Sequence, residues 1–174
     1  MNFAGEIRVL HTLGPAGTNC EAAAHRWLEA NDITGEVVLH GTLEEGVAAI
    51  RLAPSPGDAL LGCIVYPDLH TLVFANLSWL KLVDCFVMPT YNMVLARKPG
   101  SELRRIATHP APQGLVPDGC ERILVTSNSV AAARCGTEGI DGCVTTVIAA
   151  HHHGLEVVHD YGAVPMGFSI HAKF

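Results

Sequence analysis

Three turns in the sequence combine small residues with hydroxyl or amide side chains, and each follows a short apolar run. They lie at Leu13–Glu21, Thr108–Pro110 and Thr126–Ser129. A helix that begins after such a turn offers unpaired backbone N–H groups and the positive end of its dipole, and both bind carboxylates and phosphates. The pattern therefore predicts the binding of a small anionic substrate. The residues predicted to bind it are Gly14, Pro15, Gly17, Thr18, Asn19, Thr108, Ser127, Asn128 and Ser129.

The same turns have a simpler interpretation, in which Thr18, Thr108 and Ser127 only cap helices. An N-cap hydroxyl contributes roughly 1 kcal/mol, which is enough to account for any one of them. Three such turns in one chain, with two glycines in the first, favour a ligand. The first turn lacks the Lys-Ser/Thr of a Walker A loop and the third glycine of a dinucleotide-binding motif, so no cofactor is predicted.

A run of three histidines, His151-His152-His153, suggests a metal site at first sight. Consecutive residues of a helix point in different directions, so the three imidazoles are poorly placed to share one ion. They also precede Gly154, where a helix is expected to end and where cationic side chains suit the helix dipole. No metal is predicted. The six cysteines are scattered without a C-x-x-C pair and are expected to be reduced.

The elements that must position the turns alternate short apolar runs with alanine-rich segments, which is typical of an α/β fold. Helices are predicted at 19–30, 43–52, 129–134 and 146–153. Strands are predicted at 7–13, 36–40, 59–66, 80–88, 91–97, 106–108, 122–126, 142–144, 156–160 and 168–172. The three turns would then lie at the carboxyl ends of strands, where open α/β sheets bind ligands.

Size and charge limit the classes of partner. The 174 residues suit one domain or two small lobes, and the net charge of −6 argues against a nucleic-acid partner. No apolar run reaches the roughly 18–20 residues that a membrane span requires. The first 13 residues lack the pattern of a signal peptide, so a cytoplasmic protein without a membrane partner is expected.

The motifs resemble those of prephenate dehydratases, in the same order and over nearly the whole chain. Thr12–Ala23 is similar to the family's opening Gly-Pro-x-Gly-Thr-x-Ser-Glu-x-Ala-Ala signature. Thr108-His109-Pro110 resembles its Ser-His-Pro element, and Ser127–Ala132 resembles its Ser-Thr-Ala-x-Ala-Ala element. Ala149-Ala150 with Gly154–Val158 resembles the segment before its closing strand.

This resemblance implies a two-lobed fold like that of type II periplasmic binding proteins, with the active site in the interlobe cleft. The chain would be a single catalytic domain over 1–174, without the amino-acid-sensing regulatory domain often attached to dehydratases. Its first lobe would span about 1–88 plus 148–174, and its second lobe about 89–147. The family also implies a homodimer or a higher homo-oligomer.

Two departures from the family pattern bear on the reaction. Dehydratases carry Thr-Arg-Phe near the end, where this chain has Met166-Gly167-Phe168, and Tyr66–His70 stands where they carry Pro-x-Glu-Asn-Ser. Methionine donates no hydrogen bond, so the group expected to help the ring hydroxyl leave is missing. A general acid supplies about 10²–10⁴-fold in rate, so the site looks unsuited to dehydration. The stretch Val164–Ser169 instead resembles the non-aromatising prephenate decarboxylases of bacilysin-type antibiotic pathways.

The function expected from this resemblance is the non-aromatising decarboxylation of prephenate, or of a related cyclohexadienyl carboxylate, in secondary metabolism. His70 and His109 are the candidate proton donors because histidine titrates near neutrality, although both could be structural. Met166 and Phe168 are expected to form an apolar floor beneath the substrate. The alternatives are a reaction on another carbocyclic acid, as in tropone or arylacetate chemistry, a non-catalytic anion-binding module, and a dehydratase with a different proton donor.

Overall fold

The computed structural model describes residues 6–54 and 56–173, so Met1–Gly5, Ser55 and Phe174 of the expected first lobe lie outside the described residues. The chain divides into two compact units. Unit 1 consists of Met1–Met88 with Pro165–Phe174, and unit 2 consists of Pro89–Val164. The expected cleft between the lobes stays a prediction.

Unit 1 is built on a five-stranded sheet with the order β2-β1-β3-β10-β4. Its strands are β1 (Val9–Leu13), β2 (Glu36–His40), β3 (Asp58–Cys63), β4 (Leu80–Pro89) and β10 (Pro165–Lys173). Strands β1, β2 and β3 are parallel, and β10 runs antiparallel to β3. The last residues of the parallel strands, Leu13, His40 and Cys63, therefore lie at one edge, which we call the carboxyl edge of unit 1.

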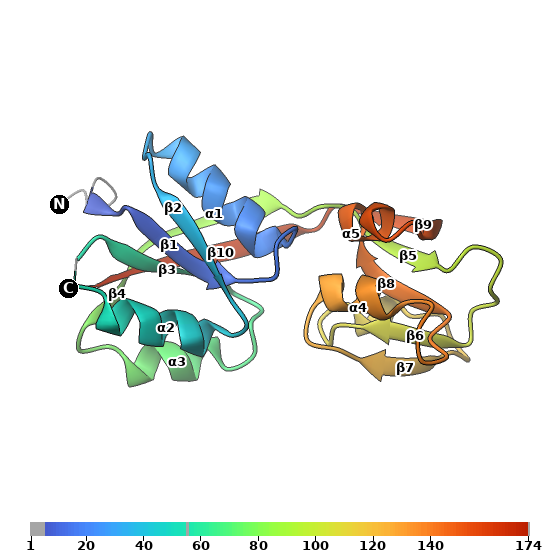
Figure 1. Cartoon of the computed structure of the whole chain (residues 1–174). Helices are drawn as coiled ribbons and strands as arrows, with labels where there is room; N and C mark the ends of the chain where they lie inside the picture. Colours follow the sequence, from blue (N-terminus) through green and yellow to red (C-terminus); the bar gives the residue numbers. More distant parts are fainter. Residues whose placement is uncertain (1–5, 55, 174) are drawn as a thin grey trace. The chain divides into compact units, whose positions relative to one another are not determined.

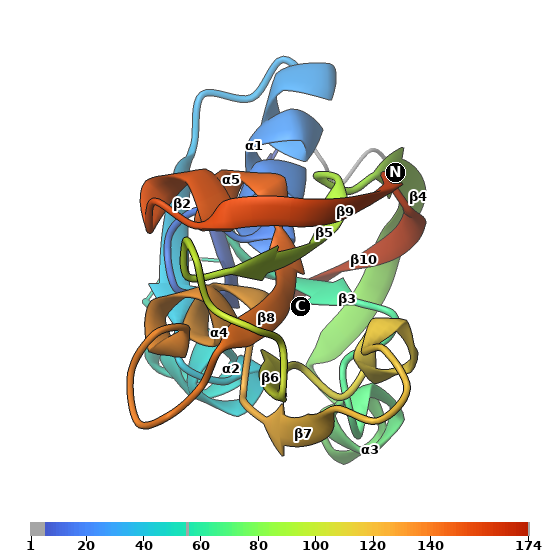
Figure 2. The same cartoon turned by 90° about the vertical axis from the view of Figure 1, so that its right-hand side faces the viewer.

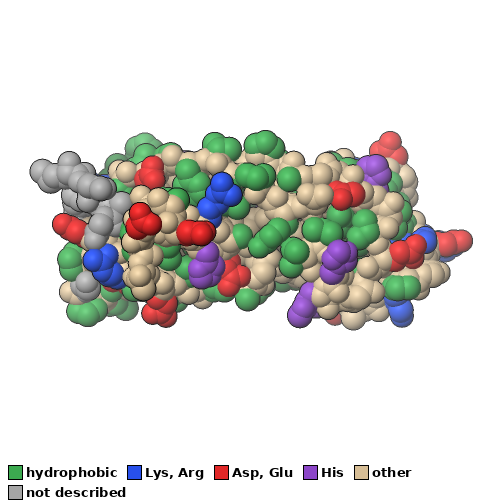
Figure 3. Space-filling model, turned by 90° about the horizontal axis from the view of Figure 1, so that it is seen from above, with side chains coloured by type: hydrophobic (Ala, Val, Ile, Leu, Met, Phe, Trp, Pro, Cys, Tyr) green, Lys and Arg blue, Asp and Glu red, His purple; other side chains and the backbone are tan. Residues whose placement is uncertain are grey.

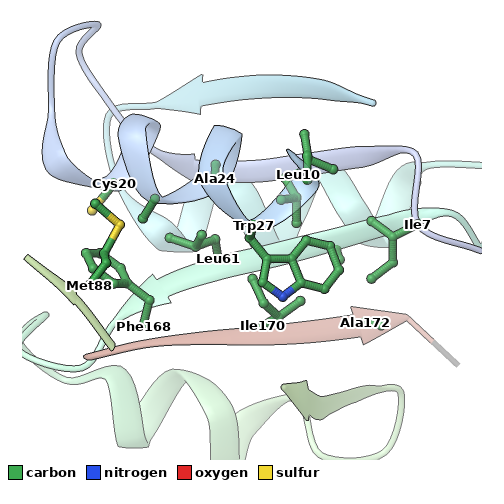
Figure 4. Packing of buried hydrophobic residues seen from close by; sticks show 13 residues of the cluster. Ile7, Leu10, Cys20, Ala24, Trp27, Leu61, Met88, Phe168, Ile170 and Ala172 are labelled. Carbon is green, nitrogen blue, oxygen red and sulfur yellow. The ribbon is translucent and has the colours of Figure 1, made fainter. Parts of the chain in front are cut away.

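Helices cover both faces of this sheet (Figure 1). Helix α1 (Asn19–Ala30) packs on one face, and α2 (Leu43–Leu52) and α3 (Leu69–Ala75) pack on the other. The α1 side is filled by an apolar cluster around Trp27 (Figure 4). Trp27 Nε1 donates to Asp84 Oδ2 at 2.6 Å. A capping box of Thr42 and Glu45 begins α2. This side-chain capping fixes where α2 begins.

Unit 2 holds a second five-stranded sheet with the order β7-β6-β8-β5-β9, which Figure 2 shows facing the viewer. Its strands are β5 (Met93–Arg97), β6 (Arg105–Thr108), β7 (Glu121–Leu124), β8 (Gly142–Thr146) and β9 (Glu156–Gly162). Its helices are α4 (Asn128–Arg134), α5 (Val147–His152) and the short 3₁₀ helix η2 (Gln113–Leu115). Strands β6, β7 and β8 are parallel, so their ends define the carboxyl edge of unit 2.

The chain returns to unit 1 later than the sequence predicts. Residues 148–164 were expected in the first lobe, but β9 pairs with β5 along its length and so belongs to unit 2. Most side chains of β9 are exposed, as in an edge strand. Its residue types therefore do not indicate which of the two sheets it joins. The sequence also missed α3, which begins after the left-handed Asp68 without a side-chain cap.

The surface carries few basic side chains, as expected from the composition. On the face seen in Figure 3, Lys and Arg side chains are isolated among neutral and acidic ones. Among the described residues, no helix has the length and hydrophobicity of a membrane span. His151, His152 and His153 are exposed, and residues 6–54 and 56–173 contain no group of three His, Cys, Asp or Glu side chains that could hold a metal ion.

Candidate active site

The first turn, in unit 1, uses several of its own hydrogen-bonding groups. Gly14 N–H donates to the carbonyl of His40 at 2.7 Å. Gly17, with φ +81°, donates its N–H to the Glu21 carboxylate at 2.6 Å. Thr18 Oγ1 donates to the carbonyl of Leu13 and accepts from Glu21 N–H, and so caps α1. An internal carboxylate thus already occupies one N–H group that was predicted to bind a ligand. Pro15 is exposed after a cis peptide bond, and Asn19 begins α1 half-buried.

The second turn does not lead into a helix, which corrects the prediction. Thr108 is fully buried and its hydroxyl donates to the carbonyl of His109 at 3.0 Å, so it caps nothing. The chain after Pro110 is irregular until η2 begins at Gln113. His109 is half-buried, its Nδ1 accepts from Ala111 N–H at 3.2 Å, and burial lowers its pKa, so the neutral imidazole is favoured.

The third turn caps a short helix, as predicted. Ser127 Oγ accepts from Val130 N–H at 3.1 Å at the start of α4. Asn128 Oδ1 is buried without a hydrogen-bond partner, and its Nδ2 makes only a 3.9 Å contact with Met93 Sδ. The adjoining Ser129 is half-buried. A buried amide oxygen without a partner is costly, so this turn has polar capacity that a ligand or water could satisfy.

The second and third turns meet at the carboxyl edge of unit 2. Val125 N–H donates to the carbonyl of Thr108 at 3.0 Å, which joins the loops that follow β6 and β7. Thr145 Oγ1, near the end of β8, donates to the carbonyl of Asn128 at 2.6 Å. The structure therefore brings Thr108 and Asn128 together within one unit, while the first turn lies in the other.

The two residues predicted to form an apolar floor differ in position. Met166 is half-buried near the start of β10. Phe168 is fully buried in the core beneath α1 (Figure 4). Its ring stacks on that of Phe86 with centroids 5.6 Å apart. Phe168 is therefore a core residue, and the prediction that it faces substrate is corrected because its ring has no exposed surface.

Between these residues, Gly167 permits a close contact. A Cβ atom at residue 167 would lie 2.6 Å from Cδ1 of Ile64, and Ile64 N–H donates to the carbonyl of Gly167 at 3.1 Å. The space beside residue 167 is thus filled by a side chain from the loop after β3. An arginine in this position, as in the dehydratase triplet, would have to displace that side chain.

His70 lies on α3 at a shallow cavity of about 390 Å³ in unit 1. The buried His171 lines the same cavity, with Nε2 3.0 Å from Ser169 Oγ and Nδ1 without a partner. Burial lowers the pKa of His171. His70 is exposed on the α3 face, and its proposed part in proton transfer stays a prediction.

The sequence did not reveal a chain of three titratable side chains in unit 1. His40, at the end of β2, places Nε2 2.9 Å from Nδ1 of His11 on β1. Nε2 of His11 lies 2.9 Å from Oδ1 of Asp58 at the start of β3. His11 and Asp58 are buried, whereas His40 is half-buried. The only sign of this chain in the sequence was that His11 and Asp58 lie in largely apolar strands.

Comparison with known proteins extends over nearly the whole chain, although no family model matches it. The chain is 27% identical to a prephenate decarboxylase of Bacillus subtilis, over 97% of this chain and 88% of that protein. The structure of a prephenate dehydratase from Arthrobacter aurescens in complex with L-Phe superposes with a TM-score of 0.71 at 18% identity, covering 95% of this chain. This chain spans only 60% of the length of that dehydratase.

A third similarity concerns the fold alone. The periplasmic VFT2 domain of BvgS from Bordetella pertussis superposes with a TM-score of 0.58 at 15% identity, over 97% of this chain and 81% of that one. The predicted α/β, periplasmic-binding-protein-like fold class is therefore confirmed. The resemblance inferred from the motifs is confirmed as well, because the chain is similar over 97% of its length to a prephenate decarboxylase.

Proposed function

We propose that this protein catalyses the non-aromatising decarboxylation of prephenate to a dihydro-hydroxyphenylpyruvate. The similarity to a prephenate decarboxylase over 88% of that protein's length supports this activity. A role in secondary-metabolite biosynthesis, a cytoplasmic location and a homo-oligomeric state belong to the same proposal. It needs neither a metal nor a cofactor.

The observation that carries the proposal is the start of β10. Dehydration needs a donor that helps the ring hydroxyl leave, and Met166 has no such group. The next residue, Gly167, is in contact with Ile64 where the dehydratase pattern places an arginine. The dehydratase triplet is therefore absent from the sequence, and the Ile64 side chain occupies the space beside residue 167.

The chemistry follows from the fate of one electron pair. When the ring carboxylate leaves as carbon dioxide, the electrons of the broken C–C bond move into the ring. Loss of hydroxide would make the ring aromatic, whereas protonation of a ring carbon keeps both the hydroxyl and the non-aromatic ring. The enzyme must therefore hold the hydroxyl without protonating it and deliver a proton elsewhere.

Each unit contains groups that are proposed to contact the substrate. In unit 2, the unpartnered amide oxygen of Asn128 can accept from a substrate hydroxyl, and Ser129 with the first N–H groups of α4 can donate to a carboxylate. In unit 1, the first turn, at Gly14–Asn19, is proposed to contact the second carboxylate. His109, held neutral by burial, can donate or accept one hydrogen bond without adding charge.

Incubation of the purified protein with prephenate tests the proposal directly. A non-aromatic hydroxy-keto acid, identified by mass spectrometry and proton NMR, together with one equivalent of carbon dioxide, is the expected result. Phenylpyruvate would overturn the decarboxylase assignment in favour of a dehydratase. Prephenate that binds, as shown by a thermal shift, but does not react would instead indicate a binding module or a different carbocyclic substrate.

Residue 166 allows a matched comparison. Met166→Thr restores a hydroxyl, and Met166→Val has nearly the same shape without it. We expect phenylpyruvate to rise as a fraction of product in Met166→Thr and not in Met166→Val, because only threonine can donate a hydrogen bond to the departing hydroxide. Equal product ratios in the two variants would show that residue 166 does not control the fate of the hydroxyl.

A further inference from the structure

The His40–His11–Asp58 chain runs across the strands of unit 1, from Asp58 at the start of β3 to His40 at the carboxyl edge. The three side chains come from three adjacent parallel strands and point to the face covered by α2. The two imidazole rings stack with centroids 5.1 Å apart, and both links of the chain measure 2.9 Å. The Gly46 position on α2 leaves room for them, since a Cβ there would lie 3.4 Å from Cδ2 of His40.

The chain has a buried end and an accessible end. Asp58 is 8% exposed and His11 is 6% exposed, so a charge on either is poorly solvated and must be balanced by the other. His40 is half-buried and adjoins the first turn, because its carbonyl accepts from Gly14 N–H at 2.7 Å. Its Nε2 is engaged by His11, while its Nδ1 has no hydrogen bond to another described residue.

We propose that Asp58, His11 and His40 form a proton relay, and that His40 delivers through Nδ1 the proton that the ring carbon takes up after carbon dioxide leaves. This inference rests on the proposed function and supplies the donor that it requires. His40 is the catalytic residue in it, because it would contact the reacting ring. His11 and Asp58 are positioning residues that act through His40.

The proton balance of the step is simple. In the loaded state Asp58 is a carboxylate, His11 carries protons on both nitrogens, and neutral His40 carries its proton on Nδ1. The electron pair of the broken C–C bond shifts one ring double bond, and the ring carbon at its far end takes the Nδ1 proton. The Nδ1 proton of His11 moves at the same time to Nε2 of His40. Both imidazoles are then neutral, and solvent restores the proton.

The groups around His40 set when the relay is loaded. They are His11 on β1, Asp58 behind it on β3, and Glu45 on α2. Burial lowers the pKa of His40 first, positive charge on His11 lowers it further, and Glu45 raises it. A proton shared by the pair is therefore best held on His11 beside the Asp58 carboxylate. The loaded state is lost as pH rises, so kcat should fall on the alkaline side.

Three variants test the relay against a purely structural network that joins the strands. His40→Gln keeps an N–H group that can donate to His11 but carries no titratable proton, Asp58→Asn removes the balancing charge, and His25→Gln replaces an exposed histidine on α1 as the control. We expect kcat to fall by about 10²–10⁴-fold in His40→Gln with KM little changed, and the alkaline limb of its pH profile to disappear. Added imidazole should restore part of the rate.

Turnover in D₂O gives a second measurement that a structural role would not change. The wild type and His25→Gln should place deuterium on one face of the ring carbon, whereas His40→Gln should place it on both faces because water then supplies the proton. A fully active, stereoselective His40→Gln would overturn the relay and leave the decarboxylase assignment intact. A wild type that does not decarboxylate prephenate would overturn the assignment itself, and the role of His40 with it.

If Asp58→Asn does not fold, the His40→Gln variant still tests the relay, because a substitution at the half-buried His40 disrupts the structure less. Imidazole ¹⁵N shifts of the wild type add a measurement that needs no substrate. The shifts of both rings should change together as the proton moves, because Nε2 of His40 lies 2.9 Å from Nδ1 of His11. Shifts that change in one ring and not in the other would contradict the shared proton.

Discussion

The contact between Gly167 and Ile64 allows the stability of the Gly167→Ala variant to be predicted. The added Cβ would lie 2.6 Å from Cδ1, 3.2 Å from Cγ1 and 3.4 Å from Cγ2 of Ile64. Carbon atoms pack at about 3.5–4.0 Å, so Cδ1 must move by about 1 Å. The backbones cannot separate easily, because Ile64 N–H donates to the carbonyl of Gly167. The strain must therefore be relieved by rotation of the Ile64 side chain.

Ile64 is 58% exposed, so its side chain has room to rotate. The cost should then fall in the lower part of the overpacking range, at about 1–2 kcal/mol. This corresponds to a fall in Tm of about 2–4 °C per kcal/mol for a chain of this size. Urea unfolding of wild type, Gly167→Ala, Ile64→Ala and the double variant forms a cycle, and the double variant should recover most of the loss.

Gly114→Ala is the matched control for this cycle. A Cβ at residue 114 meets no atom within 4 Å, so the same substitution should leave the free energy of unfolding unchanged or slightly raised. Equal stability of Gly167→Ala and wild type, or no recovery in the double variant, would refute the reasoning. Ile64 would then not fill the space beside β10, and the structural objection to an arginine at residue 167 would be removed.

Three further predictions follow from burial and capping. Phe168→Ala should lower the free energy of unfolding by about 3–5 kcal/mol, and a folded Phe168→Leu should keep its KM for prephenate; a raised KM would return the ring to substrate contact. Burial lowers the pKa of His171, so the unfolded chain binds more protons near and below the ordinary value of about 6.5. Stability is therefore lost as pH falls through that value, and urea unfolding at several pH values should show a smaller loss in His171→Gln. Glu21→Ala frees Gly17 N–H and should cost about 1 kcal/mol in chemical unfolding, as loss of a helix cap does; an unchanged midpoint would contradict the capping role.

Much of the fold was predictable because local signals and tertiary structure agree. Helices α1 and α2 and strand β2 have the predicted bounds, since side-chain caps at Thr18 and Thr42 begin both helices. Helix α3 was missed because it is short, buries only Leu72 and lacks a side-chain cap. Thr108-His109-Pro110 carries the residues of a helix start, but burial of Thr108 turns its hydroxyl to the neighbouring carbonyl instead.

The site was less predictable, because its groups are joined by contacts distant in sequence. His11 lies 29 residues from His40 and 47 from Asp58, and only the parallel register of β1, β2 and β3 brings them together. The first turn carried the strongest motif, yet its Glu21 already accepts from the N–H group predicted to bind a ligand. A motif shows which groups are present, and only the structure shows which of them are already paired.

A non-aromatising decarboxylation makes two requirements: no proton donor beside the ring hydroxyl, which concerns β10, and a proton donor for the ring carbon, which concerns β1–β3. An acid beside the ring hydroxyl would drive hydroxide out and make the ring aromatic, so a non-aromatising enzyme must lack a donor there. It must also hold a proton for the ring carbon, since the electron pair left by carbon dioxide has no other outlet. Met166 removes the first donor, and the His40–His11–Asp58 relay can supply the second. Restoring the hydroxyl with Met166→Thr and removing the relay with His40→Gln in one protein should therefore shift product toward phenylpyruvate more than either change alone.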